Sequence, residues 1–470
     1  MEFEAIIGLE LHIQMKTKSK LFSSAPVSFG KEPNTHVDII DMGFPGVMPT
    51  VNKQAVVNAI RLSNALHMHI DNTLIFERKN YYYSDLPRGY QITQQFRPLG
   101  TNGYLAINNR KIDIERLHIE EDTCKQIHLN DMTLLDYNRS DIPLVEIVTK
   151  PVIHNGKEAA LFVEKIRSIV SFLGVSDGKM ERGSIRCDVN ISITEKNSNK
   201  FGTKVEIKNL NSITNIEKAI DFEISRQSAL LSDGKSIKQE TRRFDESKKQ
   251  TVLMRVKTDD IDYRYFTEPN IVPIKLSKEF IQDAIKSSPE LAEEKKNRYL
   301  SLGVSEYHCS LLIADINVAN YFDEGIKCGA NPVLLANWLI DNIQSVLNKQ
   351  EIEITEFIIS PKLITELLCL VDKKEISNKQ AKELFAKMLS NPRSPLELLK
   401  ENDISLLNDI DVLKAVVLDV VESNPKSVID YKNGKDKALG YLVGQVISKT
   451  QGKANPALAK ELIVVELKRR

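Results

Sequence analysis

An acid and an imidazole interrupt the first apolar segment of the sequence. In EAIIGLELHIQ, Glu10 and His12 lie two residues apart, with apolar residues on either side of each. Side chains alternate between the two faces of a strand, so Glu10 and His12 share one face and the apolar residues take the other. One face builds a core and the other offers ligands. The simpler alternative is an exposed strand with a hydrated polar face, and only matching groups from other segments decide against it.

Four further segments alternate in the same way and carry polar or charged residues on one face. These residues are Arg116, His118 and Glu120 in IERLHIEED; Ser184, Arg186, Asp188, Asn190 and Ser192 in GSIRCDVNIS; Lys204, Glu206 and Lys208 in KVEIKN; and Asp262, Arg264 and Phe266 in DYRYF. Glu121 and Asp122 end the first of these segments, where alternation becomes unreliable. If the five strands are neighbours, this side of the sheet is a concave polar floor rather than a second core.

Such a floor indicates phosphoryl chemistry. Carboxylates, an imidazole and several cations fit a hard divalent cation, with Mg²⁺ as the expected ion, that holds phosphate oxygens. The sequence has no GxxxxGK[ST] motif and no kinase glycine loop, so a nucleotide would bind on the sheet itself. This resembles glutamine synthetase, whose sheet floor binds metals. The non-catalytic alternative is a groove for an RNA backbone. Several tyrosines fit such a groove or the sheet core equally well: Tyr81, Tyr82, Tyr83, Tyr90, Tyr263 and Tyr265.

The elements that position these residues change along the chain. Up to about Pro289, short alternating segments predict a large mixed sheet with a few helices. The clearest helix, GKEAALFVEKIRSIVSFLGV, is expected to end near Gly174 and to cover the apolar face of the sheet. Later helices are predicted to start where a capping residue precedes proline: Ser288-Pro289, Asn331-Pro332, Ser360-Pro361 and Ser394-Pro395. Ser377 with Gln380, and Ser394 with Glu397, have the spacing of a capping box.

We therefore expect an α+β protein of three domains. A mixed-sheet domain covers residues 1–290, an all-α domain 291–406, and a small helical tail domain 407–470. The polar stretch KENDISLLNDI, residues 400–410, is the predicted break before the tail.

Charge and cysteine usage limit the possible partners and compartments. Lys plus Arg and Asp plus Glu both number 64, so the chain as a whole does not attract nucleic acid. The five cysteines form no C-x-x-C pair, which argues against disulfides and structural zinc and favours a reducing, cytoplasmic compartment. No signal peptide or membrane span is expected.

One local basic region stands out at the end of the chain. Residues 431–470 hold nine Lys and Arg against three Asp and Glu. Small residues and glycines lie beside four candidate phosphate-contacting lysines: Lys435, Lys437, Lys449 and Lys453. The alternative is a solvated helical face with a frayed basic terminus.

Many long motifs, in order, resemble the GatB family, the B subunits of the Asp/Glu-tRNA amidotransferases. They include IIGLELHIQMKTKSKLFS, FGKEPNTHVDIIDMGFPGVMPTVNK, ERKNYYYSDLPRGYQITQ, RLHIEEDTCK, DYNRSDIPLVEIVTKP, GSIRCDVNISI, GTKVEIKNLNSITNIEKAI, QETRRFDE, DYRYFTEP and ALGYLVGQVISKTQGKANP. The resemblance implies a cradle domain related to glutamine synthetase over residues 1–290, then a helical domain and a tail domain similar to YqeY proteins.

The resemblance also implies an activity. A protein of this family works in a heterotrimer with an amidase subunit, which releases ammonia from glutamine, and a small third subunit. With ATP it phosphorylates the side-chain carboxylate of Glu-tRNA(Gln) or Asp-tRNA(Asn), and ammonia then displaces the phosphate. The expected enzyme is a C–N bond-forming ligase of protein biosynthesis that uses ATP and Mg²⁺. Whether one or both tRNAs are substrates is left open.

Site residues follow from the resemblance one position at a time. Glu10, His12 and Asp188 match acidic and imidazole metal positions, and Glu121 is favoured over Glu120 as a further ligand. Catalytic roles are expected for Glu10, His12, Glu121 and Asp188. Arg116, Lys208 and Arg264 are candidates for phosphate contacts, with ordinary surface ion pairs as the alternative. The family's cysteine pairs are missing between the first strand and the PG turn, so no zinc is expected.

Smaller departures concern single positions. Arg182 stands where relatives usually carry an acid, which places a metal role for that position in doubt. Thr267 and Asn270 replace a common Pro and Asp. Two other function classes stay open: an RNA-binding scaffold that only presents tRNA, and a ligase of small acids that needs no tRNA but leaves the basic tail unexplained.

Overall fold

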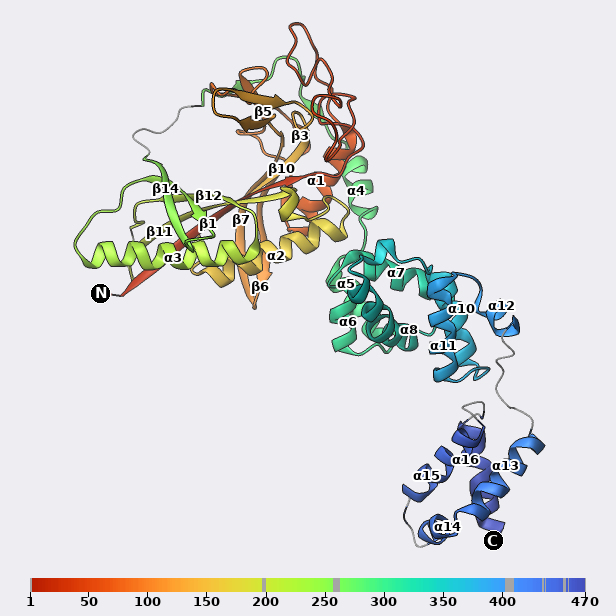
Figure 1. The fold of residues 1–470 in the computed structure, drawn as a ribbon. Helices are drawn as coiled ribbons and strands as arrows, with labels where there is room; N and C mark the ends of the chain where they lie inside the picture. Colours follow the sequence, from red (N-terminus) through yellow and green to blue (C-terminus); the bar gives the residue numbers. More distant parts are fainter. Residues whose placement is uncertain are drawn as a thin grey trace. The chain divides into compact units, whose positions relative to one another are not determined.

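The computed structural model describes residues 2–196, 200–256, 263–401, 410–432, 435, 437–450, 454 and 456–469. The chain divides into two compact units, Met1–Ala292 and Glu293–Arg470. The first contains the sheets and the second is helical (Figure 1). The expected order of a mixed sheet followed by helices is confirmed. Most of the predicted break at 400–410, residues 402–409, lies outside the described residues, and the division into three domains stays a prediction.

A nine-stranded sheet dominates the first unit. Its strand order is β14-β13-β12-β11-β1-β10-β7-β6-β2. Neighbours run antiparallel except β12 and β13, which are parallel, so the sheet is mixed. The strands are β1 (Phe3–Gln14), β2 (His69–Ile70), β6 (Gly100–Ile107), β7 (Arg110–Glu121), β10 (Pro143–Thr149), β11 (Ile185–Glu195), β12 (Val205–Leu210), β13 (Glu240–Asp245) and β14 (Gln250–Val256).

Helices cover the apolar face of this sheet. Ile7, Leu9 and Leu11 of β1 are fully buried in one core with Phe162 of α2 (Gly156–Phe172). Helix α2 runs along the sheet beside α3 (Ile213–Ser232), and α1 (Lys53–Ala65) and α4 (Lys278–Lys286) lie toward the other end (Figure 1). The predicted position of α2 is confirmed. Its end is confirmed too, because Gly174 has a φ of +67°, a conformation that glycine adopts at no steric cost.

Three small sheets complete the first unit. They are β15-β4-β5, β16-β3 and β8-β9. Their strands are β3 (Thr73–Leu74), β4 (Glu77–Asn80), β5 (Tyr90–Thr93), β8 (Lys125–His128), β9 (Thr133–Asp136), β15 (Phe266–Thr267) and β16 (Ile274–Lys275). The segment DYRYF was expected in the large sheet, and this was wrong. Phe266 pairs with Arg78 of β4 instead, so the segment belongs to a separate sheet.

The second unit is built from α-helices with short 3₁₀ and π turns. The α-helices are α5 (Ala292–Ser301), α6 (Glu306–Leu312), α7 (Ile316–Lys327), α8 (Pro332–Trp338), α9 (Gln344–Gln350), α10 (Pro361–Asp372), α11 (Asn378–Ser390), α12 (Pro395–Glu401), α13 (Ile410–Ser423), α14 (Pro425–Lys432), α15 (Lys437–Lys449) and α16 (Pro456–Arg469). The predicted starts at Pro332, Pro361 and Pro395 are confirmed, as is the capping box of Ser377.

The predicted helix start at Ser288-Pro289 was wrong. Helix α5 begins at Ala292, and Ser288 instead follows the end of α4. Its backbone N–H donates to the carbonyl of Ile285 (3.0 Å) and its hydroxyl to that of Ala284 (3.4 Å). Ser288 therefore satisfies carbonyls at the end of one helix rather than amides at the start of the next.

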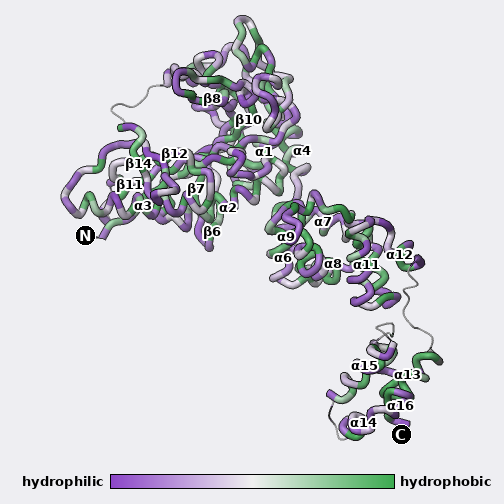
Figure 2. The backbone as a smooth tube through the Cα atoms, viewed as in Figure 1, coloured by the Kyte–Doolittle hydropathy of each residue, from purple (hydrophilic) through white to green (hydrophobic). Residues whose placement is uncertain are grey.

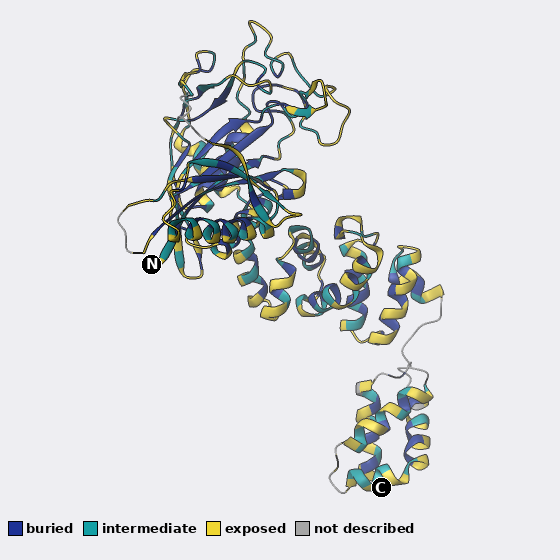
Figure 3. Cartoon of the chain, turned by 60° about the vertical axis from the view of Figure 1, so that its left-hand side comes forward, coloured by how far each residue is buried: buried dark blue, intermediate teal, exposed yellow. Residues whose placement is uncertain are grey.

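Burial follows the same division. The central strands of the large sheet are almost entirely buried (Figure 3), and the second unit has two apolar clusters, one around Trp338 and one around Leu442. Hydropathy changes repeatedly along the helices (Figure 2). Within the described ranges, no helix combines the length and apolar character needed to cross a membrane.

Candidate active site

The strand faces predicted to be polar come together on the side of the sheet opposite α2 and α3. His12 of β1 pairs with Glu146 of β10 on one side and Arg186 of β11 on the other. Glu146 in turn pairs with His118 of β7. One row of side chains therefore crosses four neighbouring strands. In the next row Glu10 pairs with Asp188. Four of the five predicted strands contribute, and β10 lies between two of them.

These rows form the floor of a cavity of about 370 Å³, called the polar pocket below. Strands β4 and β5 and the segment before β15 add residues to it. The polar pocket is lined by Glu10, His12, Lys79, Thr93, Gln95, Arg116, His118, Glu120, Glu146, Asp188, Glu206, Lys208, Tyr263 and Tyr265.

Two buried carboxylates and two imidazoles meet at its centre. His12 Nε2 lies 3.6 Å from Glu120 Oε1 and 3.5 Å from Glu146 Oε2. His118 Nε2 lies 3.5 Å from Glu120 Oε2 and 3.2 Å from Glu146 Oε2. One ligand atom each from His12, Glu120 and Glu146 falls within 4.8 Å of the others. Carboxylate oxygens with an imidazole nitrogen at this spacing can hold a divalent cation.

The pKa values show how strongly these groups interact. Burial opposes the charged form of His118, but the charge of Glu146 and hydrogen bonds to Glu120 and Glu146 outweigh it and raise its pKa to about 9. The pKa of His12 is raised in the same way. Burial also opposes ionisation of Glu146, yet the two imidazoles hold its pKa well below the ordinary value. The cluster is thus two carboxylates neutralised by two imidazolium groups.

Acids and a lysine continue the site toward β11 and β12. Glu10 accepts a hydrogen bond from Asn190 Nδ2 (2.8 Å), and burial together with the nearby Glu146 raises the pKa of Glu10. Lys208 Nζ lies 2.9 Å from both Asp188 Oδ2 and Glu206 Oε1. Burial opposes the charge on Lys208, but these two carboxylates raise its pKa. The predicted residues Glu10, Asp188 and Lys208 therefore lie in one pocket.

The preference for Glu121 over Glu120 as a ligand does not fit the structure. Alternation holds to the end of β7, so Glu120 points into the polar pocket and Glu121 points away from it. Glu121 is ion-paired with Arg88, and its Oε1 accepts the backbone N–H of Ile92 (2.7 Å). Burial raises the pKa of Glu121 against the effect of Arg88.

Of the three predicted phosphate contacts, Arg116 and Lys208 line the polar pocket and Arg264 does not. Arg264 is exposed, with a φ of +41°, and its carbonyl accepts a hydrogen bond from Asn80 (2.7 Å). The alternation expected around it is reversed, because Tyr263 and Tyr265 line the pocket instead. Asp262 lies outside the described residues.

Sequence reasoning missed two charged residues of the polar pocket. Glu146 is buried within the apolar strand PLVEIVT, and a lone acid in such a strand is a signal that could have found it. Lys79 lies in β4, and its Nζ is 4.9 Å from the centre of the Tyr263 ring. Nothing in the local pattern of ERKN distinguishes Lys79 from the basic residue beside it.

The predicted tail lysines have different surroundings. Lys435 Nζ is 2.9 Å from Asp430 Oδ1, and Lys449 is ion-paired with Asp419. Lys437 is the first residue of α15, and Lys453 lies outside the described residues. Nearby carboxylates thus offset part of the local positive charge.

The sequence was compared with known proteins. The family described as GatB/GatE catalytic domain matches residues 5–282, and the one described as GatB domain matches residues 320–467. The B subunit of the aspartyl/glutamyl-tRNA(Asn/Gln) amidotransferase of Geobacillus thermodenitrificans is 44% identical over 476 residues, covering 100% of both chains. The protein of the same name from Mesoplasma florum is 45% identical over 468 residues, covering 98% of each chain.

Proposed function

The chain belongs to the GatB family, and from this premise we propose that it is the subunit of a glutamine-dependent tRNA amidotransferase that activates and amidates the aminoacyl group. Its substrates are then Glu-tRNA(Gln), Asp-tRNA(Asn) or both. The observation that carries this proposal is the polar pocket, where buried acids, imidazoles and cations converge on one sheet face.

The proposed reaction has two steps. An oxygen of the substrate's side-chain carboxylate attacks the γ-phosphorus of ATP, and the bond to ADP breaks. Ammonia then attacks the carbonyl carbon of the acyl phosphate, phosphate leaves with the C–O bond, and nitrogen loses a proton to give the amide. Activation is needed because a carboxylate is a poor electrophile toward ammonia.

The residues of the pocket fit a bound Mg²⁺ ion. His12, Glu120 and Glu146 offer one imidazole nitrogen and carboxylate oxygens, and Glu10 and Asp188 lie in the same cavity. An ion held there would neutralise phosphate charge during the transfer. Lys79, Arg116 and Lys208 line the same pocket and would contact phosphate oxygens and orient the nucleotide.

The remaining parts of the proposal follow from family membership. The nine-stranded sheet would play the part of the sheet floor of glutamine synthetase. Ammonia would come from the amidase of the complex, and a small third subunit would make the complex a cytoplasmic heterotrimer. The tail would bind tRNA through its lysines.

Release of γ-phosphate from ATP in the presence of Glu-tRNA(Gln) or Asp-tRNA(Asn) tests the proposal, together with amide formation from added ammonium. His12→Ala should lower both rates on the order of 100-fold or more, because it removes a ligand without disturbing the apolar face of β1. Glu10→Gln and Asp188→Asn should act in the same direction.

His128→Ala is the matched control, since His128 is exposed on β8, outside the polar pocket. Unchanged turnover in a folded His12→Ala variant would contradict the assignment of the pocket. Amide formation without ATP would contradict the reaction itself and favour a scaffold.

A further inference from the structure

A second cavity begins two residues further along β1. His12 lines the polar pocket, and Gln14, on the same face of the strand, lines this cavity of about 590 Å³. It is called the basic groove below. Gln14 and Arg186 both donate hydrogen bonds to Asp122, at 3.1 and 2.9 Å. Strand geometry puts Gln14 about 7 Å from His12 along the chain, so the two cavities are close neighbours.

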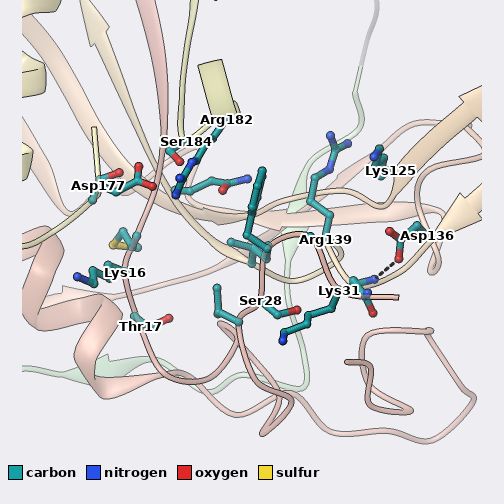
Figure 4. A pocket seen from close by; sticks show the side chains of 18 residues that line it. Lys16, Thr17, Ser28, Lys31, Lys125, Asp136, Arg139, Asp177, Arg182 and Ser184 are labelled. Atoms are coloured by element: carbon teal, nitrogen blue, oxygen red, sulfur yellow. Dashed lines mark hydrogen bonds between the residues drawn. The ribbon is translucent and has the colours of Figure 1, made fainter. Parts of the chain in front are cut away.

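The charge of the basic groove is positive. Five lining side chains are cationic, and Figure 4 shows that they come from separate segments: Lys16, Lys31, Lys125, Arg139 and Arg182. Within the described residues, no carboxylate lies within 4 Å of the charged nitrogens of these side chains except at Arg139, 3.8 Å from Asp122. Two acids also line the groove, and backbone N–H groups bind both: Asp136 accepts from Asn138 (3.0 Å) and Asp177 from Lys179 (3.0 Å).

An exposed aromatic ring lies at the same site. The Phe29 side chain is 69% exposed, and the guanidinium of Arg182 lies 5.5 Å from the centre of its ring. A cation held over an exposed ring offers both a phosphate contact and a flat surface for a base. Ser28, beside Phe29, has a buried hydroxyl without a hydrogen-bond partner among the described residues. Phe29 and Arg182 have no part in the polar pocket.

We propose that the basic groove binds the single-stranded 3′ end of the RNA substrate, with its cations on the phosphates and Phe29 and Arg182 stacking one base. This inference rests on the proposed function. The amino acid of a charged tRNA is esterified to the 3′-terminal ribose, so an amino acid side chain in the polar pocket places the last nucleotides beside it. The basic groove is adjacent, positive and partly aromatic, as single-stranded RNA requires.

The test uses the assembled amidotransferase with charged tRNA. Phe29→Ala and Arg182→Ala should each raise KM for the tRNA about tenfold while kcat stays within about twofold. A short single-stranded RNA ending in CCA should compete with charged tRNA for the wild type and much less for either variant. Because Arg182 neutralises a phosphate, Arg182→Ala should also reduce the salt dependence of KM by about one counterion, whereas Phe29→Ala should not.

Phe201→Ala and Lys238→Ala are matched controls, because Phe201 is 71% exposed and both residues lie outside the basic groove. An active wild type whose tRNA KM is unchanged in Phe29→Ala and Arg182→Ala would overturn this inference alone. Variants that fail to assemble with the other subunits but keep the wild-type KM would show that the groove holds a partner protein, and would also overturn it. A wild type without ATP-dependent amidation would instead reject the proposed function.

Discussion

Two adjacent acids at the end of β7 have different chemical surroundings. Glu120 faces the imidazoles of His12 and His118 and accepts a hydrogen bond from the hydroxyl of Thr93 (3.2 Å). Glu121 faces Arg88 on the other side of the strand. Glu120 can bind a cation by exchanging imidazolium partners for it, whereas Glu121 already has a buried cation of its own. We therefore expect the two residues to differ in kind and not in degree.

Substitution by glutamine should separate them. Glu120→Gln should lower tRNA-dependent γ-phosphate release about 100-fold or more, with little change in the unfolding transition. Glu121→Gln should chiefly lower the free energy of unfolding, by about 3 kcal/mol, because it leaves the Arg88 charge buried and unpaired. Phosphate release and urea unfolding, measured on both variants, check this.

Arg88→Met with Glu121→Gln serves as a control, since removing both charges should recover part of the lost stability. If Glu121→Gln abolished phosphate release in a stably folded protein while Glu120→Gln did not, Glu121 would be the ligand after all.

At the scale of the element, the layer of helices beneath the sheet depends on one close backbone approach. A Cβ atom added at Gly156, the first residue of α2, would lie 2.6 Å from the carbonyl oxygen of Glu217 in α3. Backbone atoms cannot move aside as a flexible side chain can. Alanine favours helix formation, but here the clash should dominate.

Gly156→Ala should therefore lower the free energy of unfolding by about 1–3 kcal/mol. Urea denaturation followed by circular dichroism measures it. Glu164→Ala, at an exposed position of the same helix, should leave stability within about 0.5 kcal/mol. Equal stability of Gly156→Ala and wild type would mean that α2 and α3 can move apart to accept a methyl group.

In the helical unit, one acid joins α5 to α7. Asp323 of α7 is ion-paired with Lys295, lies 2.9 Å from Arg298 and accepts a hydrogen bond from the Tyr299 hydroxyl (2.9 Å). Burial opposes its ionisation, but hydrogen bonds from Lys295, Arg298 and Tyr299 outweigh it and lower its pKa. A lowered folded-state pKa stabilises the fold above the ordinary aspartate value and loses this contribution as pH falls through the lowered one.

Asp323→Asn should thus cost about 3 kcal/mol near neutral pH, and the difference from wild type should shrink below about pH 3.9. The chain's single tryptophan, Trp338, is buried in the same helical cluster and reports unfolding by fluorescence. Asp341→Asn is the control, because Asp341 lies outside this network. A difference that did not depend on pH would show that Asp323 acts through packing rather than charge.

At the scale of the whole molecule, chemistry and RNA binding are expected to reside in different parts. The polar pocket lies entirely in the first unit, and the basic residues of the last 40 lie in the second. Helices α13, α15 and α16 share an apolar cluster of their own. Removing residues 407–470 should therefore leave the acids and imidazoles of the pocket in place.

This deletion should raise KM for charged tRNA and leave kcat nearly unchanged. Affinity should also fall less steeply with salt than in the full chain, because fewer counterions are released. The ion pairs of Lys435 and Lys449 with nearby acids limit how large this change can be. Steady-state kinetics at several salt concentrations measures both effects. A reduced kcat with an unchanged KM, or an unaltered salt slope, would indicate a structural tail.

Local pattern was enough for features that depend on neighbours in the chain. Alternation placed Glu10, His12, Glu120 and Asp188 on polar faces, and prolines after capping residues located the starts of α8, α10 and α12. Both follow from backbone geometry within a few residues, which the sequence states directly. The same reasoning weakened at the end of β7, where Glu121 was preferred although alternation pointed to Glu120.

Features formed by distant segments required the tertiary structure. Glu146 enters the polar pocket because β10 inserts between β1 and β7, and Lys79 and Tyr263 enter it from outside the large sheet. The register of β1 against β10 joins residues more than 130 positions apart, as His12 and Glu146 show. Such pairing depends on how all strands bury their apolar faces at once, and no short stretch of sequence contains that information.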